Sequence, residues 1–355
     1  MATTKTKSNT NEQKRKDTIF DKNIENQNIY TTTQNIDINI PIIGEKKKKV
    51  QINVNNKNKI ALVTDSSNSI TPADAKKLDI TILNFSVTRT KGPEIEVFED
   101  QTNDKTLSEI FINIDNGYKY NTSTIPLGIV EDELKRLFEK NEYVLFLPVS
   151  KGLSNQFEQL EALTKVFPNL IILNSESSAY INEYIILQVH ELIQKSKNVD
   201  SIDIIEQVKN LVNDIKLRSV TFFGIKDISG SDGGRIPKSF IKILKLAKVS
   251  PIVELDFKNK SAGFTTNWEE ISKKIIELIN KKFDGLLLEN IVDIAVVHAQ
   301  AERKYIDFLL TALVNYFHIE PNKIKIKLTP SSISIHTRKN ALGIAIITNK
   351  YKNNI

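Results

Sequence analysis

The stretch Ile60–Ser69, with the sequence IALVTDSSNS, decides the fold class of this chain. Its apolar first half is typical of a buried strand, and its second half is a polar loop. In open parallel sheets the carboxyl ends of strands collect ligands, because helix starts and free backbone donors converge there. We therefore treat Asp65 and Ser66 as candidate site residues, with an ordinary cap for the helix after Pro72 as the alternative.

The same layout of strand, polar loop and helix recurs further along the chain. The apolar run Tyr143–Val149 leads into a loop that contains Ser154, and Leu170–Leu173 leads into a loop that contains Ser175. This alternation argues for a parallel sheet flanked by helices. We expect an N-terminal α/β domain over residues 58–218.

Two further patterns fall between these strands. Ile80–Val87 is predicted to form a second strand, and residues 105–114 an amphipathic helix. Hydroxyl side chains then gather before a helix that runs through Phe138. Thr122, Ser123 or Thr124 either caps that helix, which is the default role, or donates hydrogen bonds to an anion at its positive end.

The second half of the chain has a different pattern. Pro251–Phe257 and Gly263–Thr265 are typical of paired strands around a turn, and further strands and helices follow. We expect an α+β domain with a mixed sheet over residues 219–355. His336 follows an alternating Ser-Ile-Ser-Ile run, which places it at a strand end, where a structural histidine is the common outcome and a ligand role the alternative.

The segment Ser229–Pro237, with the sequence SGSDGGRIP, follows the apolar run that starts the second half. Gly233 and Gly234 can take backbone conformations that side chains forbid, and Arg235 offers a planar fork of donors. By itself the segment can cradle a phosphate, hold an acid or turn a corner.

Composition narrows the class of protein. With 355 residues, 40% hydrophobic and 26% charged, the chain can bury a large core. It has no cysteine, which excludes disulfides, thiolate zinc sites and catalytic thiols and fits a cytoplasmic location. The net charge of +6 is not gathered around base-stacking aromatics, so we expect no nucleic acid partner.

Residues 1–57 are rich in Asn, Lys and Thr, and we expect a disordered polar extension without a signal peptide or a membrane span. The run Lys46–Lys49 allows transient contact with an acidic membrane surface, although a solvated linker is the favoured interpretation.

The residues offer little support for independent catalysis. The four histidines lack paired ligand spacing, so no metal is expected, and there is no phosphate-binding loop motif. Gly152–Gln156 supplies half of a nucleophile elbow, because Gln156 stands where the second glycine is needed. A serine hydrolase with Ser154, His336 and Asp65 stays open as an alternative.

An ordered set of short motifs resembles the DegV family of fatty-acid-binding proteins over about residues 59–350. These motifs are Leu62–Ser67, Thr122–Ser123, Ser150–Ser154, Leu173–Ala179, Gly233–Ile236, His298–Glu302, Ile335–Thr337 and Ala341–Gly343.

The resemblance implies a two-domain DegV-like fold that buries a long-chain fatty acid between its domains, with the 329–341 loop returning to that site. Such proteins present the acid to a separate fatty-acid kinase, which makes the acyl phosphate for phospholipid synthesis. By position, the residues that resemble the family's carboxylate site are Thr122, Ser123, Ser154 and His336. Arg235, with Gly233 and Gly234, resembles its kinase-facing marker.

The chain also departs from the family pattern. After Thr337 the family has Gly-Pro-Gly, whereas this chain has Arg338–Asn340, so the loop differs in shape and charge. We expect a non-catalytic lipid carrier that needs no cofactor. The alternatives are a serine-dependent acyl hydrolase or transferase, and a lipid-free paralogue that acts as an interaction protein.

Overall fold

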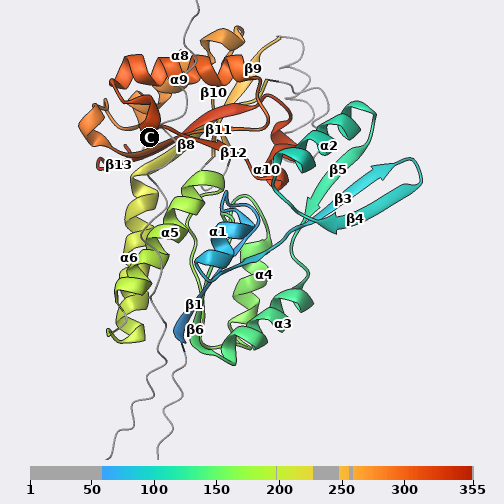
Figure 1. Cartoon of the computed structure of the whole chain (residues 1–355), viewed down its shortest axis with the longest axis vertical. Coiled ribbons are helices and arrows are strands. Elements are labelled where there is room, and N and C mark those ends of the chain that lie inside the picture. Colours follow the sequence, from blue (N-terminus) through green and yellow to red (C-terminus); the bar gives the residue numbers. More distant parts are fainter. Residues whose placement is uncertain (1–57, 197, 227–247, 256–258, 354–355) are drawn as a thin grey trace, which may run out of the picture. The chain divides into compact units, whose positions relative to one another are not determined.

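The computed structural model describes residues 58–196, 198–226, 248–255 and 259–353, all within one compact unit (Figure 1). The predicted extension 1–57 and the segment Ser229–Pro237, with Gly233, Gly234 and Arg235, lie outside these residues. Within the described ranges, no helix is both long enough and apolar enough to cross a membrane.

A four-stranded sheet confirms the predicted parallel arrangement. Its order is β2-β1-β6-β7, and every neighbouring pair is parallel. Alternate side chains face two cores: Leu62 and Leu145 pack with helix α5, whereas Val63 and Phe146 pack with α3 and α4. The bounds are β1 Asn58–Asp65, β2 Ile80–Leu83, β6 Asn141–Leu147, β7 Leu170–Ile172, α1 Pro72–Lys77, α3 Leu127–Phe138, α4 Gln156–Leu163 and α5 Ala179–Lys195.

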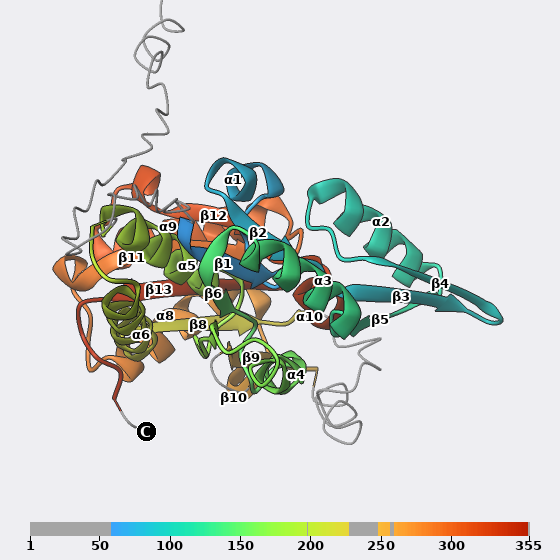
Figure 2. The ribbon, with the colours of Figure 1, turned by 90° about the horizontal axis from the view of Figure 1, so that it is seen from below.

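A separate antiparallel sheet, β4-β3-β5, corrects the prediction of a single strand over Ile80–Val87. The chain leaves the parallel sheet after Leu83 and starts β3 at Ser86, in a different sheet. Strand β3 pairs with β4 and with β5, and helix α2 covers the new sheet (Figure 2). The bounds are β3 Ser86–Lys91, β4 Glu94–Glu99, β5 Lys119–Ser123 and α2 Asp104–Asp115.

This sheet also changes the setting of the two hydroxyls predicted at a helix start. Thr122 and Ser123 lie on β5, where Thr122 pairs with Val87. Helix α3 begins after Pro126, which forms no side-chain cap. The capping role proposed for them is therefore wrong, and both side chains are held by a strand.

The third sheet is mixed, as predicted for the second half, with the order β10-β9-β8-β13-β11-β12. Helices α8 and α9 pack on one face, and α5 and α6 pack on the other (Figure 1). Strands β9 and β10 confirm the predicted pairing, but the turn expected at residues 258–261 is wrong for Asn259–Ser261, which are paired within β10. The bounds are β8 Ser219–Gly224, β9 Ser250–Leu255, β10 Asn259–Thr265, β11 Ile291–His298, β12 Lys325–Leu328, β13 Leu342–Thr348, α6 Ser201–Leu217, α8 Ile271–Lys282 and α9 Arg303–Phe317.

Helix α5 lies between the parallel sheet and the mixed sheet. Its buried residues share one core with Leu62 of β1 and with Phe223 and Ala345 of the mixed sheet. The division into domains at residue 218 stays a prediction.

The segment that carries His336 is a helix, α10 Ser331–Thr337, and not the strand and loop that its alternating sequence predicts. The Pro330 carbonyl accepts hydrogen bonds from the amides of Ile333 and Ser334 and so closes the first turn. Serine and threonine hydroxyls satisfy further carbonyls, since Ser334 donates to Thr329 and Thr337 donates to Ile333. The three serines are buried together with Ile335, whereas Ile333 is half-buried, so polarity does not reveal the helical period.

The close pairing of β13 with β8 gives a direct test of the mixed sheet. A Cβ added at Gly343 would lie 2.9 Å from the Cα of Phe223 and against the carbonyl of Phe222. Because that backbone is held in the ladder, we expect Gly343→Ala to lower the free energy of unfolding by about 3 kcal/mol. Gly128→Ala, in helix α3 with open space around it, should raise it by about 0.5–1 kcal/mol. Urea unfolding measures both variants. A free energy of unfolding in Gly343→Ala equal to that of wild type would contradict this packing.

Candidate functional site

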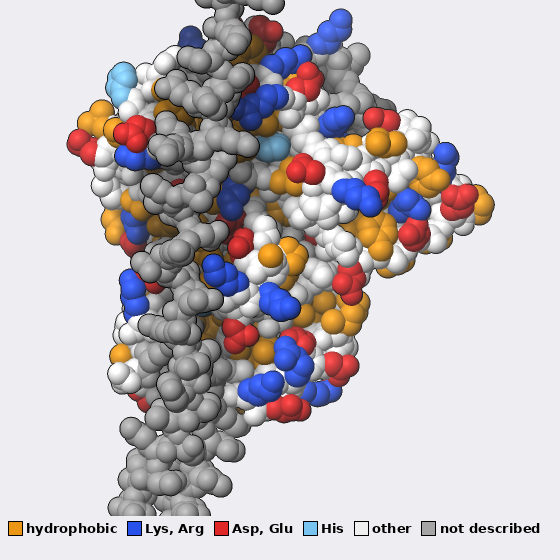
Figure 3. Space-filling view, in the orientation of Figure 1, with side chains coloured by type: hydrophobic (Ala, Val, Ile, Leu, Met, Phe, Trp, Pro, Cys, Tyr) orange, Lys and Arg blue, Asp and Glu red, His pale blue; other side chains and the backbone are white. Residues whose placement is uncertain are grey.

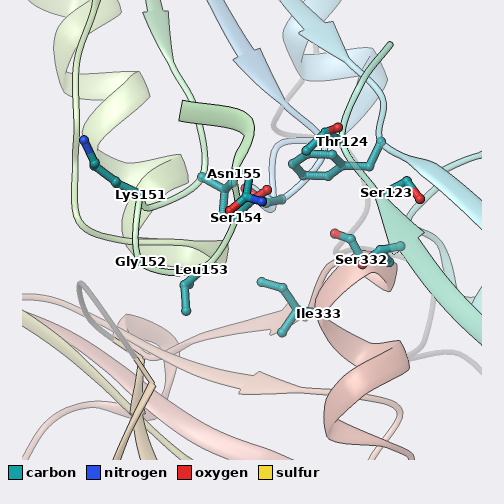
Figure 4. Close-up of a pocket in the computed structure, with 13 residues that line it drawn as sticks. Ser123, Thr124, Lys151, Gly152, Leu153, Ser154, Asn155, Ser332 and Ile333 are labelled. Atoms are coloured by element: carbon teal, nitrogen blue, oxygen red, sulfur yellow. The ribbon is translucent and has the colours of Figure 1, made fainter. Parts of the chain in front are cut away.

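A pocket of about 630 Å³ lies where the predicted polar segments meet (Figure 4). Its walls come from the loops after β1 and β6, the link between β2 and β3, the end of β5 and the start of α10. The lining residues are Ser67, Phe85, Thr122, Ser123, Thr124, Val149, Lys151, Gly152, Leu153, Ser154, Asn155, Ser332 and Ile333. The volume falls in the range typical of small-molecule sites.

Three of the predicted carboxylate-binding residues, Thr122, Ser123 and Ser154, line this pocket together. Figure 4 shows that Ser154 and Ser332 come from opposite walls, while the side chain of Lys151 points away from both. Lys151 pairs with Glu161 at 3.5 Å and Glu158 at 3.9 Å. The inner lining therefore consists mainly of hydroxyls and apolar groups.

His336 is not one of the lining residues but stands directly beside one of them. Its Nε2 atom lies 3.0 Å from Thr122 Oγ1, across 214 positions of sequence. Because either atom can be the donor, the tautomer of the imidazole decides the direction of the bond. The imidazole is placed to orient the Thr122 hydroxyl.

Ser154 has a hydroxyl that can donate into the pocket. Its Oγ accepts a hydrogen bond from the amide of Gln156 at 3.2 Å, which leaves its proton available. Gln156 in turn accepts a hydrogen bond from the amide of Ile125 at 2.7 Å. Gln156 thus ties the loop after β6, which carries Ser154, to Ile125 in the segment after β5.

Asp65, predicted as a polar loop residue, is fully buried behind the pocket. Its carboxylate accepts hydrogen bonds from the amide of Val149 at 2.6 Å and from the amide and hydroxyl of Ser67. Burial raises the pKa of Asp65 to about 6, against these hydrogen bonds, which lower it. The cap of helix α1 is Thr71, so the capping alternative for Asp65 is wrong.

Ser66 belongs to a second buried cluster, which the sequence did not reveal. Its hydroxyl donates to Asp100 Oδ2 at 2.8 Å, and Ser331 donates to Asp100 Oδ1 at 2.5 Å. Asp100 is 1% exposed, and burial raises its pKa while the serine hydroxyls oppose that rise. An acid at the end of a polar strand carries no periodic signal, so only the fold shows its partners.

Ser175 does not join the pocket lining. It is buried and accepts a hydrogen bond from Ser177 Oγ at 3.1 Å, within its own loop. The pattern of a polar loop after a strand predicts the loop correctly. It does not identify which residue of that loop faces the pocket.

The geometry does not favour the hydrolase alternative. A catalytic triad needs a histidine hydrogen-bonded to the nucleophilic serine and a carboxylate hydrogen-bonded to that histidine. Instead, Nε2 of His336 meets Thr122, and Asp65 accepts from Ser67 and Val149. Across the part of the chain that the structure describes, no group of three or more His, Asp or Glu side chains is arranged to hold a metal.

The surface adds one observation on partners. On the face shown in Figure 3, Lys and Arg side chains alternate with Asp and Glu side chains over the described elements. That distribution differs from the single basic stripe expected of a nucleic acid footprint.

Comparison with known proteins places these features in one family. A family model described as "Uncharacterised protein, DegV family" matches residues 59–349. A DegV domain-containing protein of Ureaplasma parvum is 30% identical over 83% of this chain and 97% of its own. One from Mycoplasmopsis pulmonis is 23% identical over 81% of this chain and 95% of its own.

Solved structures show the same fold. A DegV described as a fatty acid binding protein of Bacillus subtilis gives a TM-score of 0.66 at 21% identity, covering 82% of this chain and 99% of its own. A stearic-acid-binding protein of Eubacterium ventriosum gives 0.66 at 16% identity, covering 82% and 98%.

The raised pKa of Asp65 predicts a pH dependence of stability. Between its unfolded value of 3.8 and about 6, the folded state holds the proton more tightly. The free energy of unfolding should therefore fall as pH rises through this window, by on the order of 3 kcal/mol from this group. In Asp65→Asn this contribution should be absent.

Urea unfolding at pH 4, 5, 6 and 7 measures the free energy of unfolding of wild type and of Asp65→Asn. The advantage of wild type over the variant should shrink or reverse as pH rises. Asp132→Asn is the control, because the Asp132 side chain is 82% exposed, and its difference should stay flat. A wild-type advantage that grows with pH would show that the pKa of Asp65 is not raised.

Proposed function

This chain belongs to the DegV family, and we propose that it binds a long-chain fatty acid by its carboxylate and presents that group to a separate fatty-acid kinase. The kinase would form the acyl phosphate, and this chain would act as a carrier without a cofactor. The observation that supports this proposal most is the convergence of Thr122, Ser123 and Ser154 on one pocket, with His336 bonded to Thr122.

The chemistry of the lining suits a carboxylate. A carboxylate that leaves water needs several donors, because burial without hydrogen bonds is costly. The Ser154 hydroxyl has a free proton, and the Thr122 hydroxyl can donate to the ligand when it accepts from Nε2 of His336. These groups are neutral or titratable, so the pocket can hold the anion without a permanently buried cation.

The acyl chain supplies most of the binding free energy. About 15 buried methylenes contribute roughly 12 kcal/mol gross, reduced by several kcal/mol for lost freedom. Phe85, Leu153 and Ile333 give the pocket an apolar side against which the acyl chain can pack.

The kinase-facing surface is part of the same proposal. Arg235, with Gly233 and Gly234, is our candidate for the kinase contact, on the basis of the family's Gly-Gly-Arg motif.

We place this activity in the cytoplasm, with transient contact with a membrane surface during lipid delivery. The relatives' descriptions as fatty acid binding proteins support the ligand class.

Lipid analysis tests the ligand directly. Protein purified from cells is denatured, extracted and analysed by mass spectrometry, and lipid-stripped protein is titrated with palmitate. We expect about one long-chain fatty acid per chain and saturable binding. The absence of both a co-purified acyl ligand and uptake of added fatty acid would contradict the carrier proposal and would favour the lipid-free paralogue.

Site variants test the residues. Ser154→Ala and Thr122→Val should each weaken palmitate binding about tenfold, since each removes a hydrogen bond to a charged group worth about 1.5 kcal/mol. Thr90→Val, on β3 outside the pocket lining, is the matched control and should bind as wild type. Isothermal titration measures all three.

The same variants separate the carrier from the hydrolase. If wild-type protein turned over acyl esters and Ser154→Ala abolished that turnover, the serine hydrolase would replace the carrier proposal. The carrier proposal expects no turnover and a loss of affinity alone.

A further inference from the structure

The buried carboxylate of Asp100 connects segments that are far apart in sequence. It follows β4 directly and is 1% exposed. It accepts one hydroxyl from Ser66, after β1, and one from Ser331, the first residue of α10. Two donors of different segments thus share one acceptor group, and that acceptor has little access to water.

Each of these two serines is next in sequence to a residue that lines the pocket. Ser66 precedes Ser67, and Ser331 precedes Ser332. The wall at Phe85 joins the same network. The amide of Phe85 donates to Ser66 Oγ at 3.0 Å, and its carbonyl accepts from the amide of Asp100 at 2.7 Å.

The start of α10 is fastened at several points by residues 100–102. The Ser331 amide donates to Thr102 Oγ1 at 3.0 Å, and the Ser331 hydroxyl also lies 2.8 Å from the carbonyl of Gln101. Helix α10 has no side-chain cap at Pro330, so these contacts satisfy its first turn from outside. His336 lies on this two-turn helix, so the seating of Ser331 fixes where its imidazole meets Thr122.

We propose that Asp100 is a positioning residue for the acyl head-group site: it seats α10 through Ser331 and thereby holds His336 against Thr122. This role rests on the proposed function, because the head group is the carboxylate bound there. Asp100 itself does not line the pocket, and it acts through the serines that it holds.

The charge and shape of the carboxylate explain why an acid is needed. Two hydroxyl donors converge on its two oxygens, one on each. Asparagine offers one acceptor oxygen and a donating amide, so it can replace only one of the two bonds in the same direction. Alanine replaces neither and leaves both serines to find other acceptors.

The test uses the full chain, with palmitate as the ligand probe and the imidazole resonances of His336 as a second readout. We expect Asp100→Ala to weaken palmitate binding at least tenfold and to shift the His336 resonances in the lipid-free protein. Asp100→Asn should fall between alanine and wild type. Ser331→Ala should weaken binding in the same direction.

A double-mutant cycle identifies the route of the effect. If Asp100 acts through Ser331, the double variant should bind no more weakly than Asp100→Ala alone. Asp293→Asn is the control for lost stability. Asp293, on strand β11, also accepts two side-chain donors, Tyr180 at 2.9 Å and Lys325 at 2.6 Å, besides the amide of Ile294 at 2.8 Å. It should lower Tm and leave palmitate affinity and His336 unchanged.

Wild-type affinity with unshifted His336 resonances in folded Asp100→Ala would overturn the proposal, as would additive effects in the cycle. If Asp100→Ala does not fold, Asp100→Asn and Ser331→Ala decide by the same two readouts. If wild-type protein binds no palmitate, the proposed function fails, and the His336 resonances alone still test whether Asp100 positions the helix.

Discussion

The hydrogen bond between Thr122 and His336 sets the demands on the rest of this structure. It joins a strand of the small antiparallel sheet to helix α10 across 214 residues, at 3.0 Å. A bond of that length tolerates little displacement on either side. Pairing with β3 fixes Thr122, and the contacts of Ser331 with residues 100–102 fix the helix that carries His336.

Two buried carboxylates support this geometry at a cost. Asp65 and Asp100 are both desolvated, and burial raises the pKa of each carboxyl. Hydrogen-bond donors offset this cost. Val149 and Ser67, which line the pocket, donate to Asp65, and Ser66 and Ser331, next in sequence to lining residues, donate to Asp100. Acids placed behind a binding pocket in this way hold its walls without placing a negative charge on the lining itself.

The sequence predicted those parts of the fold whose pattern is local. Buried strands such as β1 and β6 are apolar runs in the sequence, and polar loops come directly after them. This pattern predicted the parallel sheet and the pocket-lining Ser154. The antiparallel sheet was missed because the break after Leu83 is short and the pairing of β3 with β5 is non-local. Helix α10 was missed because its serines are as buried as Ile335 and more buried than Ile333, so polarity does not mark the buried face.

The candidate site was predictable to the same degree. Hydroxyls before a predicted helix pointed to Thr122, and a polar loop after a predicted strand pointed to Ser154. The position of His336 after the Ser-Ile-Ser-Ile run left a structural and a ligand role open, and the family resemblance favoured the ligand role. Asp100 and Ser331 escaped both routes, since their roles depend on each other over 231 positions. The predictions for Arg235, Gly233 and Gly234 concern residues outside the described part of the chain.

The most direct measurement is a crystal structure of the full chain with a bound long-chain fatty acid. A carboxylate in the pocket, within hydrogen-bond distance of Thr122 and Ser154 and with His336 still on Thr122, is the predicted result. A fatty acid whose head group lies away from these hydroxyls, or a pocket left closed by side chains at saturating ligand, would contradict it.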